Sequence, residues 1–151
     1  ELAVQGEYLD KVGAVLREQG LTFVTHNHTP EILNGARETR SNLRLTRPEN
    51  MGLCVDTHWV LRGGESPIGL LREWGSRVKA LHLRNSTSGV WSESFGPGDI
   101  DHKEIAAWIR QTGYAGPLIV ELAYEAATPR TRPLRENLRL GREYIREVFG
   151  C

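Results

Sequence analysis

The chain has 151 residues, of which 39% are hydrophobic and 25% are charged, and its 19 basic and 19 acidic side chains cancel. That is long enough for one domain with a hydrophobic core, and the composition is that of an ordinary globular protein. A net charge of zero gives no electrostatic reason to expect nucleic-acid binding, and no apolar stretch is long enough to span a membrane. No signal peptide is visible, and Cys54 lies in an apolar run as a small buried hydrophobe, so a cytoplasmic location is expected.

The first half of the chain alternates between helix and strand patterns. Gly20 ends the first helix, and Ser66 and Pro67 are residue types that begin a helix, here the one expected at residues 66–74. The second strand is a short apolar run without alternation, which is typical of a strand buried on both faces. In order, the expected elements are helix 7–19, strand 21–25, helix 36–45, strand 51–55 and helix 66–74.

The second half continues the same alternation. Asp101 is expected to cap a helix that Gly113 ends, and a loop rich in serine and glycine separates that helix from the strand before it. The expected elements are strand 78–81, loop 85–98, helix 104–111, strand 117–120 and helix 133–148. Strands that alternate with helices in this way predict an α/β fold with a parallel sheet.

An ionisable residue lies at the end of each predicted strand. Taken singly, each is better explained as a capped strand end or a satisfied polar group. Four in succession indicate one shared site, because the carboxyl ends of parallel strands lie on one face. Two carboxylates and two imidazoles suit a divalent cation such as Mn²⁺, Co²⁺ or Zn²⁺, with Mg²⁺ as a further candidate. These four residues are His26, Asp56, His82 and Glu121.

Several short segments also resemble, in order and spacing, the sugar phosphate isomerase/epimerase family of the xylose-isomerase-like TIM barrels. Each segment alone is a weak signal, whereas the ordered set is fairly specific and covers residues 21–124. The segments are 26–31 (HNHTPE), 56–59 (DTHW) with 63–64 (GG), 82–85 (HLRN), 96–101 (GPGDID), and 113–117 (GYAGP) with 120–121 (VE).

The resemblance implies a (β/α)8 barrel, which typically needs about 250 residues. Residues 1–151 are therefore expected to be a single partial domain, the C-terminal half of such a barrel. It would hold strands five to eight, with strands one to four missing and residues 1–19 as the fourth helix. A half barrel has two open sheet edges and an uncovered inner face, so homo-oligomer formation is an open possibility.

The resemblance also implies the metal ligands. Asp56, His82 and Glu121 match family ligands, and His26 stands where the family commonly has Glu. Glu121 is then expected to remove or return a proton, and either His26 acts as the second base or Glu31 reaches back to do so.

Four further residues are expected to contact the substrate. His28 and Arg84 would bind hydroxyl or phosphate groups, and Trp59 would stack on a sugar ring or pack as part of a lid. Asn85 occupies a place where the family often has Asp, and it completes the predicted substrate-binding set. Trp91 is expected either to line the cleft or to cover it, and His102 is expected on the surface.

The resulting hypothesis is a metal-dependent isomerase or epimerase that acts on a sugar or sugar phosphate. It would transfer a proton next to a carbonyl through a metal-stabilised enediolate. The alternatives are a keto-polyol dehydratase of the inosose or dehydroshikimate type, and a truncated sugar-binding relative without catalysis. An abasic-site endonuclease is the least favoured, because the chain lacks both the additional His ligands and a basic groove.

Overall fold

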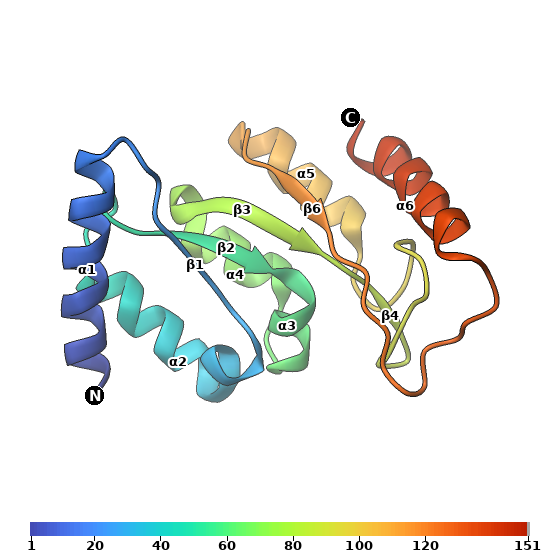
Figure 1. Ribbon diagram of the computed structural model, residues 1–151, viewed down its shortest axis with the longest axis horizontal. Coiled ribbons are helices and arrows are strands. Elements are labelled where there is room, and N and C mark those ends of the chain that lie inside the picture. Colours follow the sequence, from blue (N-terminus) through green and yellow to red (C-terminus); the bar gives the residue numbers. More distant parts are fainter. Residues whose placement is uncertain (151) are drawn as a thin grey trace.

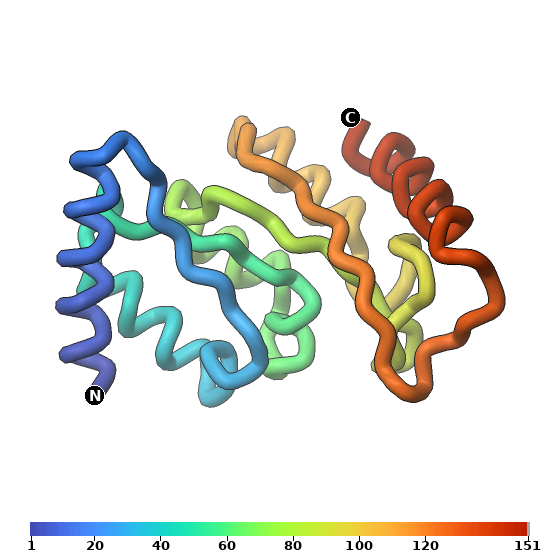
Figure 2. The backbone as a smooth tube through the Cα atoms, viewed as in Figure 1, coloured from blue at the N-terminus to red at the C-terminus, as the bar shows by residue number. Residues whose placement is uncertain are grey.

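Four parallel strands form the centre of the chain in the computed structural model, which describes residues 1–150 (Figure 1). The strands lie side by side in the order β1, β2, β3, β6, so neighbours along the chain are also neighbours in space. Figure 2 shows the same succession in the backbone trace. The predicted parallel α/β sheet is confirmed. Its strands are β1 (Val24–His26), β2 (Gly52–Asp56), β3 (Val78–Leu83) and β6 (Leu118–Val120).

The helices form a layer in which each contacts the next along the chain. The first and last helices, α1 and α6, lie at opposite ends of the sheet (Figure 1). The helices are α1 (Leu2–Glu18), α2 (Thr29–Leu45), α3 (Thr57–Arg62), α4 (Pro67–Trp74), a 3-10 turn (Gly75–Arg77), α5 (His102–Thr112) and α6 (Leu134–Phe149).

The hydrophobic core lies between this helical layer and the sheet. Leu53 and Val55 of β2 belong to it together with Trp74 and Trp108. Side chains alternate between the two faces of a strand, so Cys54 and Asp56 point to the face of β2 opposite Leu53 and Val55. That face is where the ionisable strand ends meet.

Local capping follows the sequence signals. The Ser66 hydroxyl accepts a hydrogen bond from the Gly69 N–H at 3.2 Å, and the Asp101 carboxylate accepts one from Lys103 N–H at 2.9 Å. Gly113 ends α5 with a φ of +68°, a left-handed conformation that glycine adopts without a steric cost. The predicted starts of α4 and α5 are thus close to the observed ones.

Three features differ from the sequence-based prediction. Helix α2 begins earlier than expected and is interrupted by non-helical backbone at residues 33–36. Helix α3 starts immediately after β2, where no helix was predicted. The loop 85–98 contains a small antiparallel hairpin of β4 (Ser86–Thr87) and β5 (Val90–Trp91).

The prediction that His102 lies on the surface is wrong. Its side chain is fully buried, with ring centroids 4.6 Å from Phe95 and 6.1 Å from Tyr144. The side-chain amide of Asn85 donates a hydrogen bond to Nδ1 of His102 at 3.3 Å. His102 follows the helix cap directly, and that place faces inward because α6 and the loop 85–98 close over the start of α5.

The sheet is open along both edges within residues 1–150. Strands β1 and β6 each pair with a single neighbour, so the described residues do not form a closed barrel. In the same part of the chain, no helix has both the length and the apolar character needed to cross a bilayer.

Candidate metal centre

The four ionisable strand ends converge at one end of the sheet. Asp56 and His82 are paired in register on adjacent strands, and their ligand atoms lie within 4.8 Å of those of Glu121. The ring of His26 lies beside that of His82, with centroids 4.7 Å apart. The parallel arrangement therefore brings together all four residues that the sequence singled out as metal ligands.

Asp56 is the most deeply buried of these residues, with no exposed surface. Its Oδ1 accepts hydrogen bonds from the backbone N–H groups of His58 at 2.8 Å and Trp59 at 2.9 Å, and so caps α3. Its Oδ2 is buried and has no hydrogen-bond partner among residues 1–150. Burial raises the pKa of the Asp56 carboxyl, since the charged form is poorly solvated there.

Glu121 is held from two sides. Its Oε2 lies 2.8 Å from Nδ1 of His82, and its Oε1 accepts a hydrogen bond from the guanidinium of Arg84. Arg84 is only 2% exposed, whereas the side chain of Glu121 is 40% exposed. The buried guanidinium of Arg84 thus holds the partly exposed side chain of Glu121 in place.

The other side of the centre is aromatic. His28 contacts His26 edge to face at 4.8 Å between centroids, and it contacts Trp59 in the same manner at 5.5 Å. Burial lowers the pKa of His26, which favours the neutral imidazole that a metal ion requires. Glu31 accepts a hydrogen bond from the backbone N–H of His28 at 2.7 Å and so fixes the turn that carries His28.

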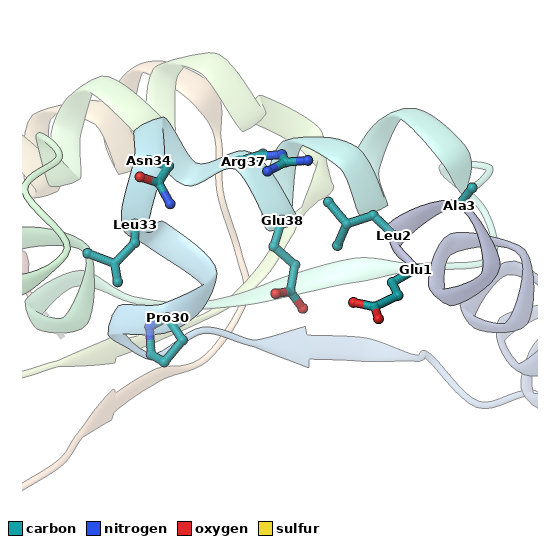
Figure 3. A pocket seen from close by; sticks show the side chains of 8 residues that line it. All are labelled: Glu1, Leu2, Ala3, Pro30, Leu33, Asn34, Arg37 and Glu38. Atoms are coloured by element: carbon teal, nitrogen blue, oxygen red, sulfur yellow. The ribbon is translucent and has the colours of Figure 1, made fainter.

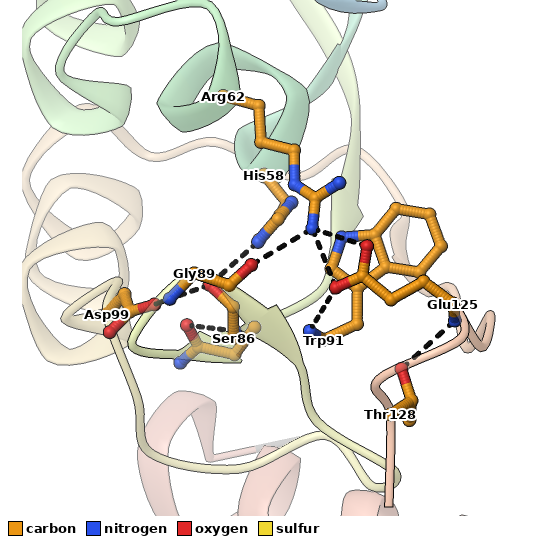
Figure 4. A network of polar contacts seen from close by, with 9 residues as sticks. His58, Arg62, Ser86, Gly89, Trp91, Asp99, Glu125 and Thr128 are labelled. Carbon is orange, nitrogen blue, oxygen red and sulfur yellow. Dashed lines mark hydrogen bonds and ion pairs between the residues drawn. The ribbon is translucent and has the colours of Figure 1, made fainter.

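A chain of polar contacts joins Asp56 to the hairpin loop, and Figure 4 shows its part from His58 to Asp99. His58, whose backbone caps onto Asp56, places its Nε2 2.9 Å from Oγ of Ser86, and Ser86 donates to Asp99 at 2.6 Å. Asp99 also accepts from backbone N–H groups of the hairpin. Burial lowers the pKa of His58 to about 4, so its ring is neutral at pH 7. His58 therefore serves as a fixed link between the two loops.

A second group of contacts in Figure 4 fixes Trp91. The indole contacts two guanidinium groups, with Arg84 at 4.2 Å and Arg62 at 4.7 Å from the ring centroid. Glu125 pairs with Arg62 at 2.9 Å and accepts from the Trp91 backbone N–H at 2.8 Å. Trp91 thus packs against both Arg84 and Arg62.

Asn85 occupies a different environment from the other predicted substrate-binding residues. It is 1% exposed, and its side-chain amide bonds the backbone of Gly96 and Ile100 in the following loop. These contacts favour a structural role, in which Asn85 holds the loop closed beneath the centre. By contrast, each of the other three contacts a metal-ligand candidate. His28 packs against His26, Arg84 pairs with Glu121, and the backbone N–H of Trp59 donates to Asp56.

Comparisons with known proteins identify the family. A family model described as xylose isomerase-like TIM barrel matches residues 2–147. The chain belongs to this family.

Among curated relatives, an inosose dehydratase from Clostridium tetani is 29% identical over 157 residues, covering 92% of this chain and 52% of that protein. The chain thus spans about half the length of the curated relatives it matches. A sugar phosphate isomerase/epimerase from Parabacteroides distasonis has a similar fold, with a TM-score of 0.79 and 20% identity, covering 95% of this chain and 51% of that one. The IolI protein, solved with a bound zinc atom, has a TM-score of 0.69 and 15% identity, covering 96% of this chain and 55% of that one.

The residues of this xylose isomerase-like chain fit a divalent cation. Oδ2 of Asp56 and Nδ1 of His26 are both buried and have no hydrogen-bond partner within the described part of the chain. An unpaired buried polar group costs about 1–3 kcal/mol, so a bound cation would relieve that cost. Carboxylate oxygens with imidazole nitrogens form a donor set for Zn²⁺, Mn²⁺ or Co²⁺.

Some contributors to this region were not anticipated from the sequence. Cys54 was expected only as a buried hydrophobe, and it is indeed 7% exposed, yet its sulfur lies within 4.8 Å of ring nitrogens of His26 and His82. Burial raises the pKa of the Cys54 thiol. The signal was present in the sequence, because Cys54 precedes Asp56 by two residues and so shares its face of the strand.

A separate hollow lies between the start of α1 and α2 (Figure 3). Its lining includes Glu1, Pro30 and Glu38, and both glutamates extend toward the same space in the figure. None of the predicted metal-ligand or substrate-binding residues lines it.

Proposed function

We propose that this chain carries the metal-binding part of an enzyme that transfers a proton at the carbon next to a carbonyl group of a sugar or polyol. The observation that carries the proposal is the cluster of Asp56, His82 and Glu121, whose ligand atoms lie within 4.8 Å of one another at the carboxyl end of a parallel sheet. In barrels of this kind the strand ends at that face supply the catalytic groups.

The proposed ligands are His26, Asp56, His82 and Glu121. A divalent cation bound by them would supply Lewis-acid stabilisation of negative charge on the substrate oxygens. Asp56 has one oxygen held by the start of α3, so its other oxygen is presented in a fixed direction. This rigidity favours binding, because little side-chain freedom remains to be lost.

Glu121 is the proposed proton carrier. Its side chain is 40% exposed and lies at the boundary between the cluster and solvent. Arg84 holds one of its carboxylate oxygens, which orients the group as a general base. His26, neutral because of burial, is proposed as the second group that accepts or returns a proton.

Substrate contacts are proposed for the aromatic and basic residues at the rim. Trp59 presents an amphipathic ring beside His28 and is suited to stack against the C–H face of a sugar. Arg84 has a buried Nη1 that has no hydrogen-bond partner in residues 1–150, so it can donate to a substrate hydroxyl or phosphate.

Isomerisation or epimerisation of a sugar or sugar phosphate is the leading proposal, and it is supported by the fold shared with the P. distasonis isomerase/epimerase. Dehydration of an inosose-like keto-polyol is the second candidate, favoured by the 29% identity to the C. tetani inosose dehydratase. Both reactions begin with removal of a proton next to a carbonyl. In the first, a proton returns to carbon; in the second, the neighbouring hydroxyl leaves as water.

The two reactions are distinguished in D₂O with Mn²⁺ present, using the longest natural polypeptide that contains this chain. An isomerase or epimerase incorporates deuterium at carbon and keeps the number of hydroxyl groups, whereas a dehydratase releases water and yields a product with one hydroxyl fewer. Proton NMR of a panel of ketoses, ketose phosphates and inososes reads both outcomes.

Variants test the assigned residues. Glu121→Gln and Asp56→Asn are each expected to lower the exchange rate by at least about a hundredfold, the scale of a lost acid–base group. Glu104→Gln, an exposed glutamate on α5, is the matched control and is expected to leave the rate unchanged. Full exchange activity in Glu121→Gln would refute the role assigned to that carboxylate.

A further inference from the structure

A thiol lies directly beside two imidazoles of the proposed metal centre. Cys54 pairs in register with His26 on the neighbouring strand, and it shares a strand face with Asp56. The sulfur of Cys54 and ring nitrogens of His26 and His82 all lie within 4.8 Å of one another. Unlike an isolated buried cysteine, these three groups offer one sulfur and two nitrogens close enough together to bind a single ion.

The inner face therefore carries two overlapping sets of ligands. One set consists of Asp56, His82 and Glu121 and is dominated by carboxylate oxygen, whereas the other consists of His26, Cys54 and His82 and has one sulfur and two nitrogens. Oxygen ligands suit Mg²⁺ and Mn²⁺, while thiolate and imidazole favour Zn²⁺ and its softer relative Cd²⁺. His82 is common to both sets.

The orientation of the imidazoles leaves nitrogens for the second set. Nδ1 of His26 is buried and unpartnered in the described residues. Nδ1 of His82 is bonded to Glu121 at 2.8 Å, so its Nε2 is the nitrogen that can bind a cation without breaking that pair. Cys54 is a free cysteine and is buried, which keeps its sulfur away from bulk solvent.

We propose that Cys54, His26 and His82 form a thiolate-containing site for a soft divalent cation, next to the carboxylate centre and sharing both of its imidazole ligands. On binding, a bond forms between the sulfur and the cation, and the thiol proton passes to solvent. Because His26 and His82 are proposed ligands of both sites, a soft cation at Cys54 competes with a hard cation at the carboxylates. The thiolate site thus sets the metal selectivity of the chain. This inference rests on the proposed function because the two sites share ligands, but metal binding at Cys54 does not require turnover.

The test uses this chain with Cys151 replaced by Ser, so that Cys54 is its one remaining thiol. Cd²⁺ is titrated while the ultraviolet charge-transfer band of sulfur–cadmium coordination is followed, and Mn²⁺ binding is measured separately by calorimetry. Cys54→Ala and Cys54→Ser in the same background remove the sulfur with little change in volume, and circular dichroism checks that each variant folds. Asp56→Asn removes a ligand of the other set alone.

The band is expected in the parent and in Asp56→Asn, and it is expected to be absent from both Cys54 variants, with Cd²⁺ affinity at least about tenfold weaker, or 1.4 kcal/mol. Bound Cd²⁺ is expected to weaken Mn²⁺ binding in the parent. A Cd²⁺ affinity unchanged by the folded Cys54 variants would overturn the thiolate site. Unchanged Mn²⁺ binding in Asp56→Asn would instead refute the carboxylate centre and leave the thiolate site standing.

Discussion

Asp56 performs two tasks with its two oxygens, and substitution can separate them. Oδ1 accepts from the backbone N–H groups at the start of α3, at 2.8 and 2.9 Å, whereas Oδ2 is buried and unpartnered within residues 1–150. Asp56→Asn keeps an oxygen for the cap and removes the negative charge that a cation needs. Asp56→Ala removes both.

The expected magnitudes follow from these contacts. Without metal, Asp56→Asn is expected to remain within about 1 kcal/mol of the parent in free energy of unfolding, because the cap is kept and an unpaired buried charge is lost. Asp56→Ala is expected to lose a further 1–2 kcal/mol, roughly the value of a lost N-cap. At a free metal concentration of about 100 times the dissociation constant, the parent gains about 2.7 kcal/mol, which both variants are expected to lack.

The assay is urea unfolding of the three proteins, each with and without Mn²⁺ or Zn²⁺, followed by tryptophan fluorescence. The parent is expected to show a metal-dependent rise in unfolding midpoint that is missing from both variants. If Asp56→Asn kept the full metal-dependent rise, Asp56 would not be a ligand. If Asp56→Ala were as stable as Asp56→Asn without metal, the cap would contribute nothing measurable.

Three other predictions concern stability and association. Burial lowers the pKa of His102 from 6.5 to about 4, so the stability that the neutral ring contributes is complete above pH 6.5 and is lost as the pH falls toward 4, by about 3 kcal/mol in total. Urea titrations of the parent and of His102→Phe should show this loss of stability in the parent alone, and equal pH profiles would contradict it. Ile119 is 40% exposed on the open edge strand β6, so the chain is expected to exceed its monomer mass of 17.0 kDa in light scattering at high concentration; Ile119→Lys should reduce that association, and a parent that stays monomeric at every concentration would refute the reasoning. A Cβ at Gly13 would lie 1.9 Å from the backbone oxygen of Asn50, so Gly13→Ala should destabilise the fold by several kcal/mol despite its higher helix propensity, as chemical denaturation would show; a neutral or stabilising effect would mean that α1 does not pack as described.

Much of the candidate site was predictable from the sequence because a strand end is a local feature. A short apolar run that stops at an ionisable residue predicts both the strand and the place of that ionisable side chain at its end, as at Asp56 and Glu121. Parallel strands then require such ends to share one face. The convergence of His26, Asp56, His82 and Glu121 therefore needed no long-range information beyond the alternation of helices and strands.

Contacts between loops depend on distances that no sequence pattern encodes. His102 has the local context of a surface residue, and only the packing of α6 and of the loop 85–98 over the start of α5 buries it. Trp91 contacts Arg62 and Arg84 because it lies on a short hairpin that the sequence did not predict. Local order in this chain is thus determined by periodicity and capping, whereas the surroundings of each functional group are decided by how separate segments meet.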